Sequence, residues 1–180
     1  MDFDSAFIKA VAAVAEAYVR VPIADSAPVV RERAFAYELY HQLRESCAIS
    51  GYTLTGELEK AAHPDLRNSA VKRLAPDLLV HVPGDRRGNR VAIEIKGGRP
   101  RTHAFQKDLA SLCFLRDRFG YERLIYLVYG ITARQERNLA ERMRRVRALR
   151  GQPADLRKIE LWVRLAGERH PTLVNWALTD

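Results

Sequence analysis

Residues 73–98, RLAPDLLVHVPGDRRGNRVAIEIKGG, decide the fold, because two apolar segments flank a polar turn and carry charged side chains within them. We expect an outgoing strand over Pro76–Val82 and a returning strand over Arg90–Gly97, joined by a turn that holds two glycines. The sequence therefore predicts a β-hairpin. Three charged residues interrupt its apolar strands: Asp77, Glu94 and Lys96.

The alternation of apolar residues also predicts how the two strands pair. On the returning strand, a period of two places Ile93 on the core face and both Glu94 and Lys96 on the opposite face. Pairing Leu78 with Ile93 aligns the apolar faces of the strands and places Asp77 opposite Glu94. A shift of one residue would move Asp77 to the core face, so the same hydrophobic pattern determines the register and the site.

Two carboxylates held opposite each other need a cation between them or a proton on one of them. At about 4 Å they repel by roughly 4 kcal/mol at an effective dielectric constant of 20. A hard divalent ion suits oxygen ligands, so we expect Mg²⁺, with Mn²⁺ as the alternative, bound by Asp77, Glu94 and the backbone carbonyl of Ile95. Lys96 would orient or deprotonate the attacking water, or offset charge on the phosphorane. A Glu-x-Lys pair alone is more often an ordinary exposed ion pair, and the Pro-Asp partner favours a site.

The segments around the hairpin predict an α/β protein with a mixed central sheet flanked by helices. The near-continuous apolar run RLIYLVY is typical of a central strand covered on both faces. The segment 21–30 is expected to be a plain connection. Helices are predicted over 3–21, 30–47, 102–119 and 133–150, and further strands over 52–58, 123–129, 158–165 and 172–178.

Composition limits the class of protein. With 180 residues and 47% hydrophobic content, the chain suits a single domain over 1–180. Thirty Lys and Arg against 22 Asp and Glu leave a formal charge of +8, which favours a polyanionic partner. No run of about 18 apolar residues or basic leader is present, and two cysteines are too few for a disulfide framework. We therefore expect a cytoplasmic protein that makes no contact with membranes.

Pro76-Asp77, a hairpin and then Glu94-Ile95-Lys96 resemble the signature of the PD-(D/E)xK phosphodiesterase superfamily, the restriction-endonuclease-like nucleases. The αβββαβ core of that superfamily has the order expected here over residues 30–130, between an extra N-terminal helix and a C-terminal extension over 133–180. The resemblance implies that Asp77 and Glu94 bind the metal ion and that Lys96 is the catalytic lysine.

Further site residues follow from the resemblance by position. Glu38 falls where many members carry an acidic residue on the first core helix, often an extra metal ligand. Glu57, at the end of the first core strand, competes with it for that role. Gln106 and Lys107 lie on the helix after the motif, where some members place polar site residues.

The resemblance implies a metal-dependent nuclease, an endonuclease acting on DNA, with RNA left open. One alternative is a catalytically silent nucleic-acid-binding or assembly module on the same fold. Another is the nuclease subunit of a larger defence or mobile-element complex, and a homodimer suits double-strand cleavage. Arginines expected to contact the nucleic-acid backbone are Arg73, Arg99, Arg101, Arg144 and Arg145.

Overall fold

The two strands of the predicted hairpin lie side by side in a six-stranded mixed sheet, which confirms the expected α/β class. The computed structural model describes residues 2–46, 51–57, 75–148 and 156–176. The strands follow chain order across the sheet, with antiparallel pairs at both edges and parallel pairs around the central strand β6. They are β3 (Thr53–Gly56), β4 (Leu78–His81), β5 (Val91–Gly97), β6 (Arg123–Ile131), β7 (Ile159–Leu165) and β8 (Thr172–Val174).

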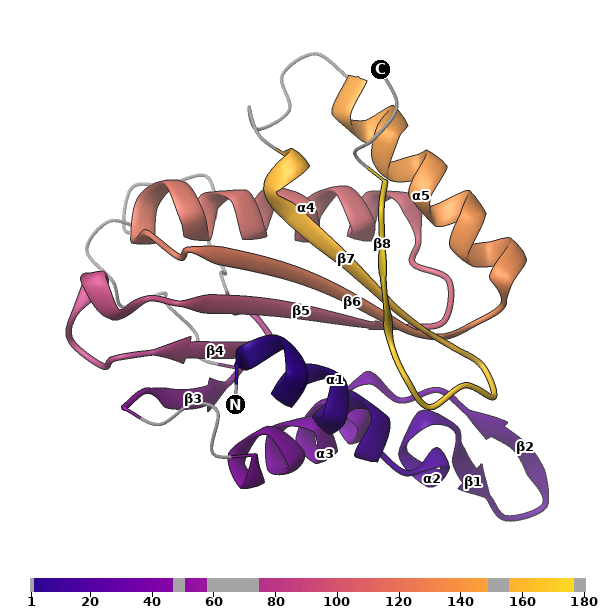
Figure 1. Ribbon diagram of the computed structural model, residues 1–180. Coiled ribbons are helices and arrows are strands. Elements are labelled where there is room, and N and C mark those ends of the chain that lie inside the picture. The colour runs from indigo at the N-terminus through magenta and orange to yellow at the C-terminus, as the bar shows by residue number, and fades with distance from the viewer. Residues whose placement is uncertain (1, 47–50, 58–74, 149–155, 177–180) are drawn as a thin grey trace.

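Helices cover both faces of this sheet, as Figure 1 shows, with α4 and α5 above it and α1 to α3 below it. Each face buries its own hydrophobic cluster, and strand β6 contributes alternate residues to the two. The helices of the described ranges are α1 (Phe3–Ala13), α2 (Glu16–Val19), α3 (Glu32–Glu45), α4 (Thr102–Phe119) and α5 (Ala133–Ala148).

The strand register agrees with the prediction. Leu78 pairs with Ile93 and Val80 pairs with Val91, so β4 and β5 are aligned as the apolar pattern requires. Leu78 and Ile93 belong to the cluster under α1 and α3, whereas Ala92 belongs to the cluster under α4. The face of β5 that carries Glu94 is therefore the face that α4 covers.

The N-terminal region differs from the single helix expected over residues 3–21. Helix α1 is capped by the side chain of Asp2, which accepts a hydrogen bond from the backbone of Ser5 at 2.7 Å. It ends at Ala13 because the buried guanidinium of Arg164 donates hydrogen bonds to the carbonyls of Val11 and Val14, at 3.0 and 2.9 Å. A residue 150 positions away thus ends the helix, and sequence periodicity carries no sign of that contact.

The expected connection over residues 21–30 is a two-stranded hairpin, formed by β1 (Val21–Ile23) and β2 (Ser26–Val29). Asp25 makes its turn in the left-handed region, with φ of 56°, a conformation that aspartate tolerates better than most residues. The hairpin lies beyond α2 at one corner of the molecule (Figure 1).

Strand β3 is shorter than the segment 52–58 because Glu57 has a φ of 44°, which ends the extended backbone. Residue 58 of the predicted strand lies outside the described residues, as do residues 61–74 of the segment 61–75, whose lack of periodicity predicts a loop, and residues 177–178 of the final predicted strand. No helix in the described ranges is both long and apolar enough to cross a membrane.

Candidate active site

The site is built around the ammonium group of Lys96, on the α4 side of strand β5. Its Nζ lies 3.0 Å from Glu94 Oε1, 3.5 Å from Asp108 Oδ2 and 3.5 Å from Glu32 Oε2. Strand β5 supplies Glu94 and Lys96 two residues apart on one face, α4 supplies Asp108, and the first residue of α3 supplies Glu32. One cation is thus surrounded by carboxylates from three elements.

Asp77 stands directly before β4 and is held in place by the backbone. Its Oδ2 accepts a hydrogen bond from the N–H of Ile95 at 2.6 Å, and its own carbonyl accepts one from the N–H of Glu57 at 3.0 Å. The N–H and C=O of a strand residue point to the same edge, so the Ile95 carbonyl faces the same side as Asp77. The negative charge of Asp77 acts on Glu94, so the two carboxyl groups lie near each other at the end of the β4–β5 register.

Burial changes the protonation of both carboxyl groups. Desolvation raises the pKa of Asp77 to about 6, against a lowering by its hydrogen bond to Ile95 and by the charge of Lys96. Desolvation also raises the pKa of Glu94 to about 8, and the negative charge of Asp77 adds to that rise. Without a metal ion, this pair therefore holds a proton to a higher pH than two exposed carboxyl groups would, and Glu94 holds it more tightly than Asp77.

Lys96 responds in the opposite way. Burial lowers its pKa, but the charges of Glu94, Asp108 and Glu32 together outweigh burial and hold the pKa above its ordinary range. The pKa of Asp108 is raised by burial despite the nearby charge of Lys96. Lys96 is accordingly a protonated cation at neutral pH in this arrangement.

Asp108 and Glu32 are site residues that sequence reasoning missed. Asp108 could have been found, because helical spacing puts it on the same face as Phe105, Leu109 and Leu112, where a carboxylate within an apolar stripe needs a partner. Glu32 gives no such signal, because it begins α3 at an exposed position and reaches Lys96 only through the packing of α3 against the sheet.

Glu38 and Glu57 make other contacts. Glu38 accepts a hydrogen bond from Gln42 at 2.8 Å, one turn further along α3. It lies six residues after Glu32, about 9 Å along the helix axis and on a different side, so Glu32 rather than Glu38 is the glutamate of α3 beside Lys96. Glu57 forms an exposed ion pair with Arg33 at 3.1 Å and positions Asp77 through its backbone.

The polar residues expected on α4 flank Asp108. Lys107 is exposed and Gln106 is half-buried on the side of α4 that faces α5. A small cavity of 60 Å³ lies on the other side of the helix, lined by Pro76, Glu94 and Asp108 among others. This volume has room for one or two water molecules beside the carboxylates.

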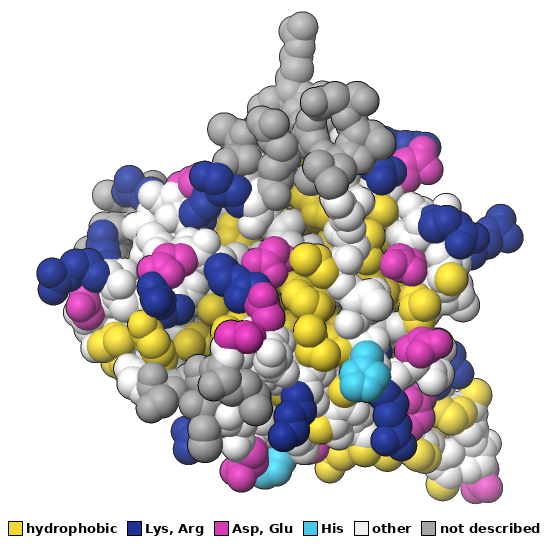
Figure 2. All heavy atoms as spheres, viewed as in Figure 1, with side chains coloured by type: hydrophobic (Ala, Val, Ile, Leu, Met, Phe, Trp, Pro, Cys, Tyr) yellow, Lys and Arg dark blue, Asp and Glu magenta, His cyan; other side chains and the backbone are white. Residues whose placement is uncertain are grey.

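The arginines expected to contact nucleic acid lie in different settings. Arg99 and Arg101 are exposed in the segment between β5 and α4, whereas Arg73 lies outside the described residues. Arg144 donates to the carbonyl of Trp176 at 3.2 Å, and Arg145 pairs with Glu141 one turn before it. Figure 2 shows basic side chains spread over the face in view with acidic side chains between them.

The oxygen atoms around Lys96 can be ligands of a divalent ion. Asp77, Glu94 and the Ile95 carbonyl are oxygen ligands of the kind that Mg²⁺ takes, and desolvation raises the pKa of both acids even though Lys96 is near them. Asp108 Oδ2 adds a buried oxygen that makes no hydrogen bond within the described residues and lies 3.5 Å from Lys96 Nζ. Within the described ranges, however, no three His, Cys, Asp or Glu side chains are arranged as a complete ligand set. The residues present therefore fit an ion held by two acids, a carbonyl and water.

Comparison of the chain with protein-family models, with curated proteins and with solved structures found no match.

Proposed function

We propose that this protein is a metal-dependent phosphodiesterase of the PD-(D/E)xK superfamily that hydrolyses DNA. One observation carries the proposal: half-buried Asp77, directly before β4, and half-buried Glu94, in the middle of β5, lie beside Lys96, and desolvation raises the pKa of both carboxyl groups. An acid pair that is costly to ionise without a cation is expected where a divalent ion normally balances the charge. The order α3-β3-β4-β5-α4-β6 is also the order of the superfamily core and supports the assignment.

Each site residue has a distinct task in this proposal. Asp77, Glu94 and the carbonyl of Ile95 would hold Mg²⁺ or Mn²⁺. When bound, the ion would polarise the phosphodiester and lower the pKa of the attacking water. Lys96, held protonated by its acidic neighbours, would donate to a phosphate oxygen and stabilise the charge that develops in the transition state. Its raised pKa favours this role over that of a base.

The direct test is cleavage of supercoiled plasmid and of linear DNA and RNA, with Mg²⁺, with Mn²⁺ and with EDTA. We expect metal-dependent cleavage by the wild-type protein, lost by 100-fold or more in both Glu94→Gln and Lys96→Gln. Glu168→Gln makes the same chemical change at an exposed residue between β7 and β8 and serves as the matched control. Wild-type protein that cleaves nothing with either ion, or cleavage that survives in Glu94→Gln, would remove the proposal.

A second candidate function is a nucleic-acid-binding or assembly module that keeps the fold but not the activity. The observation that favours it is the lack, within the described ranges, of a complete set of three acidic or imidazole ligands. This candidate predicts binding of nucleic acid without turnover, and no tightening of that binding when millimolar Mg²⁺ is added. Calorimetric titration of the wild-type protein and Glu94→Gln with Mg²⁺ separates the two candidates, because only the nuclease requires an ion at Glu94.

If the protein is a nuclease, we expect low intrinsic sequence specificity. Its arginines would contact phosphate groups, which position a protein on DNA but carry no sequence information. A partner in a larger complex, or a second copy in a homodimer, would then supply target choice or double-strand cleavage. Cleavage by the isolated protein at one short sequence would contradict this expectation.

A further inference from the structure

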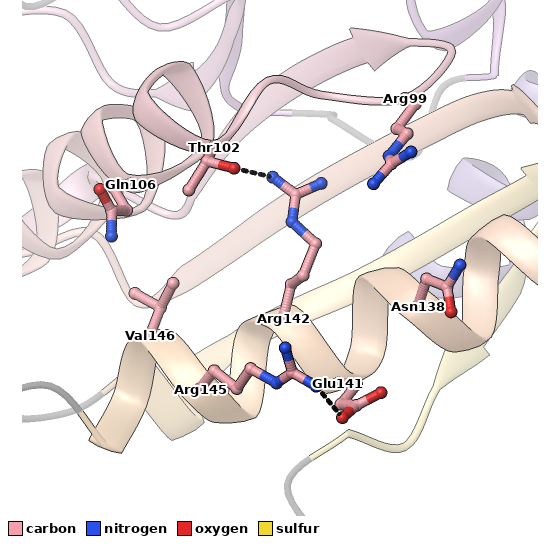
Figure 3. A pocket seen from close by; sticks show the side chains of 8 residues that line it. All are labelled: Arg99, Thr102, Gln106, Asn138, Glu141, Arg142, Arg145 and Val146. Carbon is pink, nitrogen blue, oxygen red and sulfur yellow. Dashed lines mark hydrogen bonds and ion pairs between the residues drawn. The ribbon is translucent and has the colours of Figure 1, made fainter.

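A second, cationic cavity lies on the opposite side of α4 from the carboxylates. It has a volume of 430 Å³ and opens between the first turns of α4 and the middle of α5, a size within the range of small-ligand sites. Figure 3 shows three guanidinium groups around it, from the segment after β5 and from α5. These belong to Arg99, Arg142 and Arg145.

Arg142 is fixed at the centre of this cavity. Its guanidinium donates to the carbonyl of Pro100 at 2.9 Å and to Thr102 Oγ1 at 3.5 Å, and it lies over the ring of Phe105 at 5.0 Å from the centroid. Burial lowers the pKa of Arg142, and the like charge of Arg99 lowers it further. A rigidly held cation is therefore kept close to a second cation, which is unfavourable unless an anion comes between them.

Arg99 has no counter-charge within the described parts of the chain: no hydrogen bond or ion pair joins it to any residue there. Arg145 pairs with Glu141 across the rim, as the dashed line in Figure 3 marks. Three guanidinium groups against one carboxylate leave the lining with two positive charges in excess. The cavity thus presents uncompensated positive charge in a concave, partly preformed setting.

The surrounding backbone and side chains also suit an oxyanion. The first turn of α4 begins beside the cavity, and no side chain caps it, so its free N–H groups and the positive end of the helix dipole add to the field of the arginines. Gln106 and Asn138 supply neutral amide donors to the same space. Two converging guanidiniums with amide donors around them match the oxygens of a phosphate group.

The cavity is close to the acidic site. Arg99 follows Lys96 by three residues, so at most about 11 Å separates their α-carbons. Arg142 packs over Phe105, the ring of Phe105 meets Tyr126 edge-on at 5.4 Å, and Tyr126 is the neighbour of Glu94 in the parallel β5–β6 register. A nucleic-acid strand has one phosphate per about 3.4 Å of helix axis, so one strand can span both places.

We propose that the cavity of Arg99, Arg142 and Arg145 binds a backbone phosphate of the same nucleic-acid strand whose scissile phosphate lies at Lys96. This inference rests on the proposed function for its ligand. The two sites lie on opposite sides of α4, so the strand passes around the beginning of that helix. Arg99 and Arg142 grip the phosphate, and Arg145 reaches it from the rim.

The test compares two neutralised arginines from the same short segment. Arg99→Gln removes a charge from the cavity, whereas Arg101→Gln removes one that is exposed and outside the lining. Neither side chain of the pair makes a hydrogen bond within the described residues, so both variants are expected to fold. The affinity for a fluorescent 20-nucleotide DNA is measured at several salt concentrations, with EDTA present to prevent cleavage.

We expect Arg99→Gln to weaken binding about tenfold more than Arg101→Gln does, and to lower the slope of log affinity against log salt by about 1. Equal effects of the two substitutions would overturn the phosphate site while leaving metal-dependent cleavage by the wild-type protein intact. The converse result, Arg99-dependent binding by a protein that cleaves nothing, would sustain the phosphate site and remove the nuclease.

Inorganic phosphate provides the third arm, because a free phosphate has the same chemistry as a backbone phosphate. We expect inorganic phosphate at millimolar concentration to compete with the oligonucleotide in the wild-type protein and Arg101→Gln, and less in Arg99→Gln. Phosphate binding that depends on Arg99, with no binding of the oligonucleotide, would make a free phosphate compound the ligand and overturn the backbone assignment.

Discussion

Replacing Glu94 with glutamine is expected to stabilise the metal-free protein, and to stabilise it more at pH 8 than at pH 5. Glutamine has the shape of protonated Glu94, so the substitution makes permanent the form that the buried site prefers. The pKa of Glu94 is higher in the folded protein than in the unfolded chain, so the folded state holds this proton more tightly. Its contribution to stability is present at low pH and is lost as the pH rises through about 8.

The size of the effect follows from the two pKa values. A difference of one pKa unit corresponds to about 1.4 kcal/mol, and Glu94 rises from 4.5 to about 8 on folding. Because the unfolded chain loses this proton more readily, the raised pKa then lowers the stability of the folded state by about 1 kcal/mol at pH 5 and by about 4 kcal/mol at pH 8. The side chain is only 12% exposed, so water screens little of this cost. The advantage of Glu94→Gln should therefore grow by about 3 kcal/mol between these pH values.

Urea unfolding in EDTA, followed by circular dichroism at pH 5 and pH 8, measures this difference. Glu168→Gln, which changes an exposed glutamate, should follow the wild-type protein at both pH values. Millimolar Mg²⁺ at pH 8 should recover stability for the wild-type protein but not for Glu94→Gln, because an ion at the acid pair binds only the folded state. An advantage of Glu94→Gln that is the same at pH 5 and pH 8 would refute the reasoning, since Glu94 would then not hold its proton.

Two other substitutions test the surroundings of the site. Lys96→Met should destabilise the metal-free protein, the opposite of the effect of Glu94→Gln. It should lower the unfolding free energy by about 2 kcal/mol at pH 8, because it leaves the acids without their cation, and by less at pH 5, where the acids take up protons. Gly97→Ala should lower the unfolding free energy by about 2 kcal/mol or more, because a Cβ there would lie 2.2 Å from the side chain of Val30. Gly56→Ala is the control and should lower it by less, because a Cβ there meets nothing closer than 3.6 Å. Equal losses in the two glycine variants would contradict the close packing at Gly97.

The sequence predicted most of the central architecture because its signals are local. Alternation over Leu78–His81 and Val91–Gly97 determines the faces of both strands, and matching those faces leaves one register, which the structure confirms. That register carries Asp77 to Glu94, and Lys96 follows on the same face. The mixed sheet flanked by helices likewise follows from the order of periodic segments, while the identity of the core with a nuclease core stays a prediction.

What sequence reasoning missed depends on contacts between distant residues. The end of α1 is decided by Arg164, and the hairpin of β1 and β2 replaces the expected connection, because its alternation is too short and too interrupted by prolines to predict strands. Glu32 and Asp108 join the site through the packing of α3 and α4 against opposite faces and edges of the sheet. Glu32 and Glu38 lie on the same helix, and which of them reaches Lys96 depends on how α3 is rotated and placed relative to β5, which the sequence alone does not give.

By itself, the sequence determined the register that pairs Leu78 with Ile93 and that brings Asp77 toward Glu94, because a period of two and a hydrophobic core permit only one alignment of the two strands. Only the tertiary structure decided which other charges surround that lysine, and that Arg99 and Arg142 face each other across a separate cavity. The physical reason is that side chains on different elements meet according to how helices pack on a sheet, and that packing is set by the whole core rather than by any local pattern.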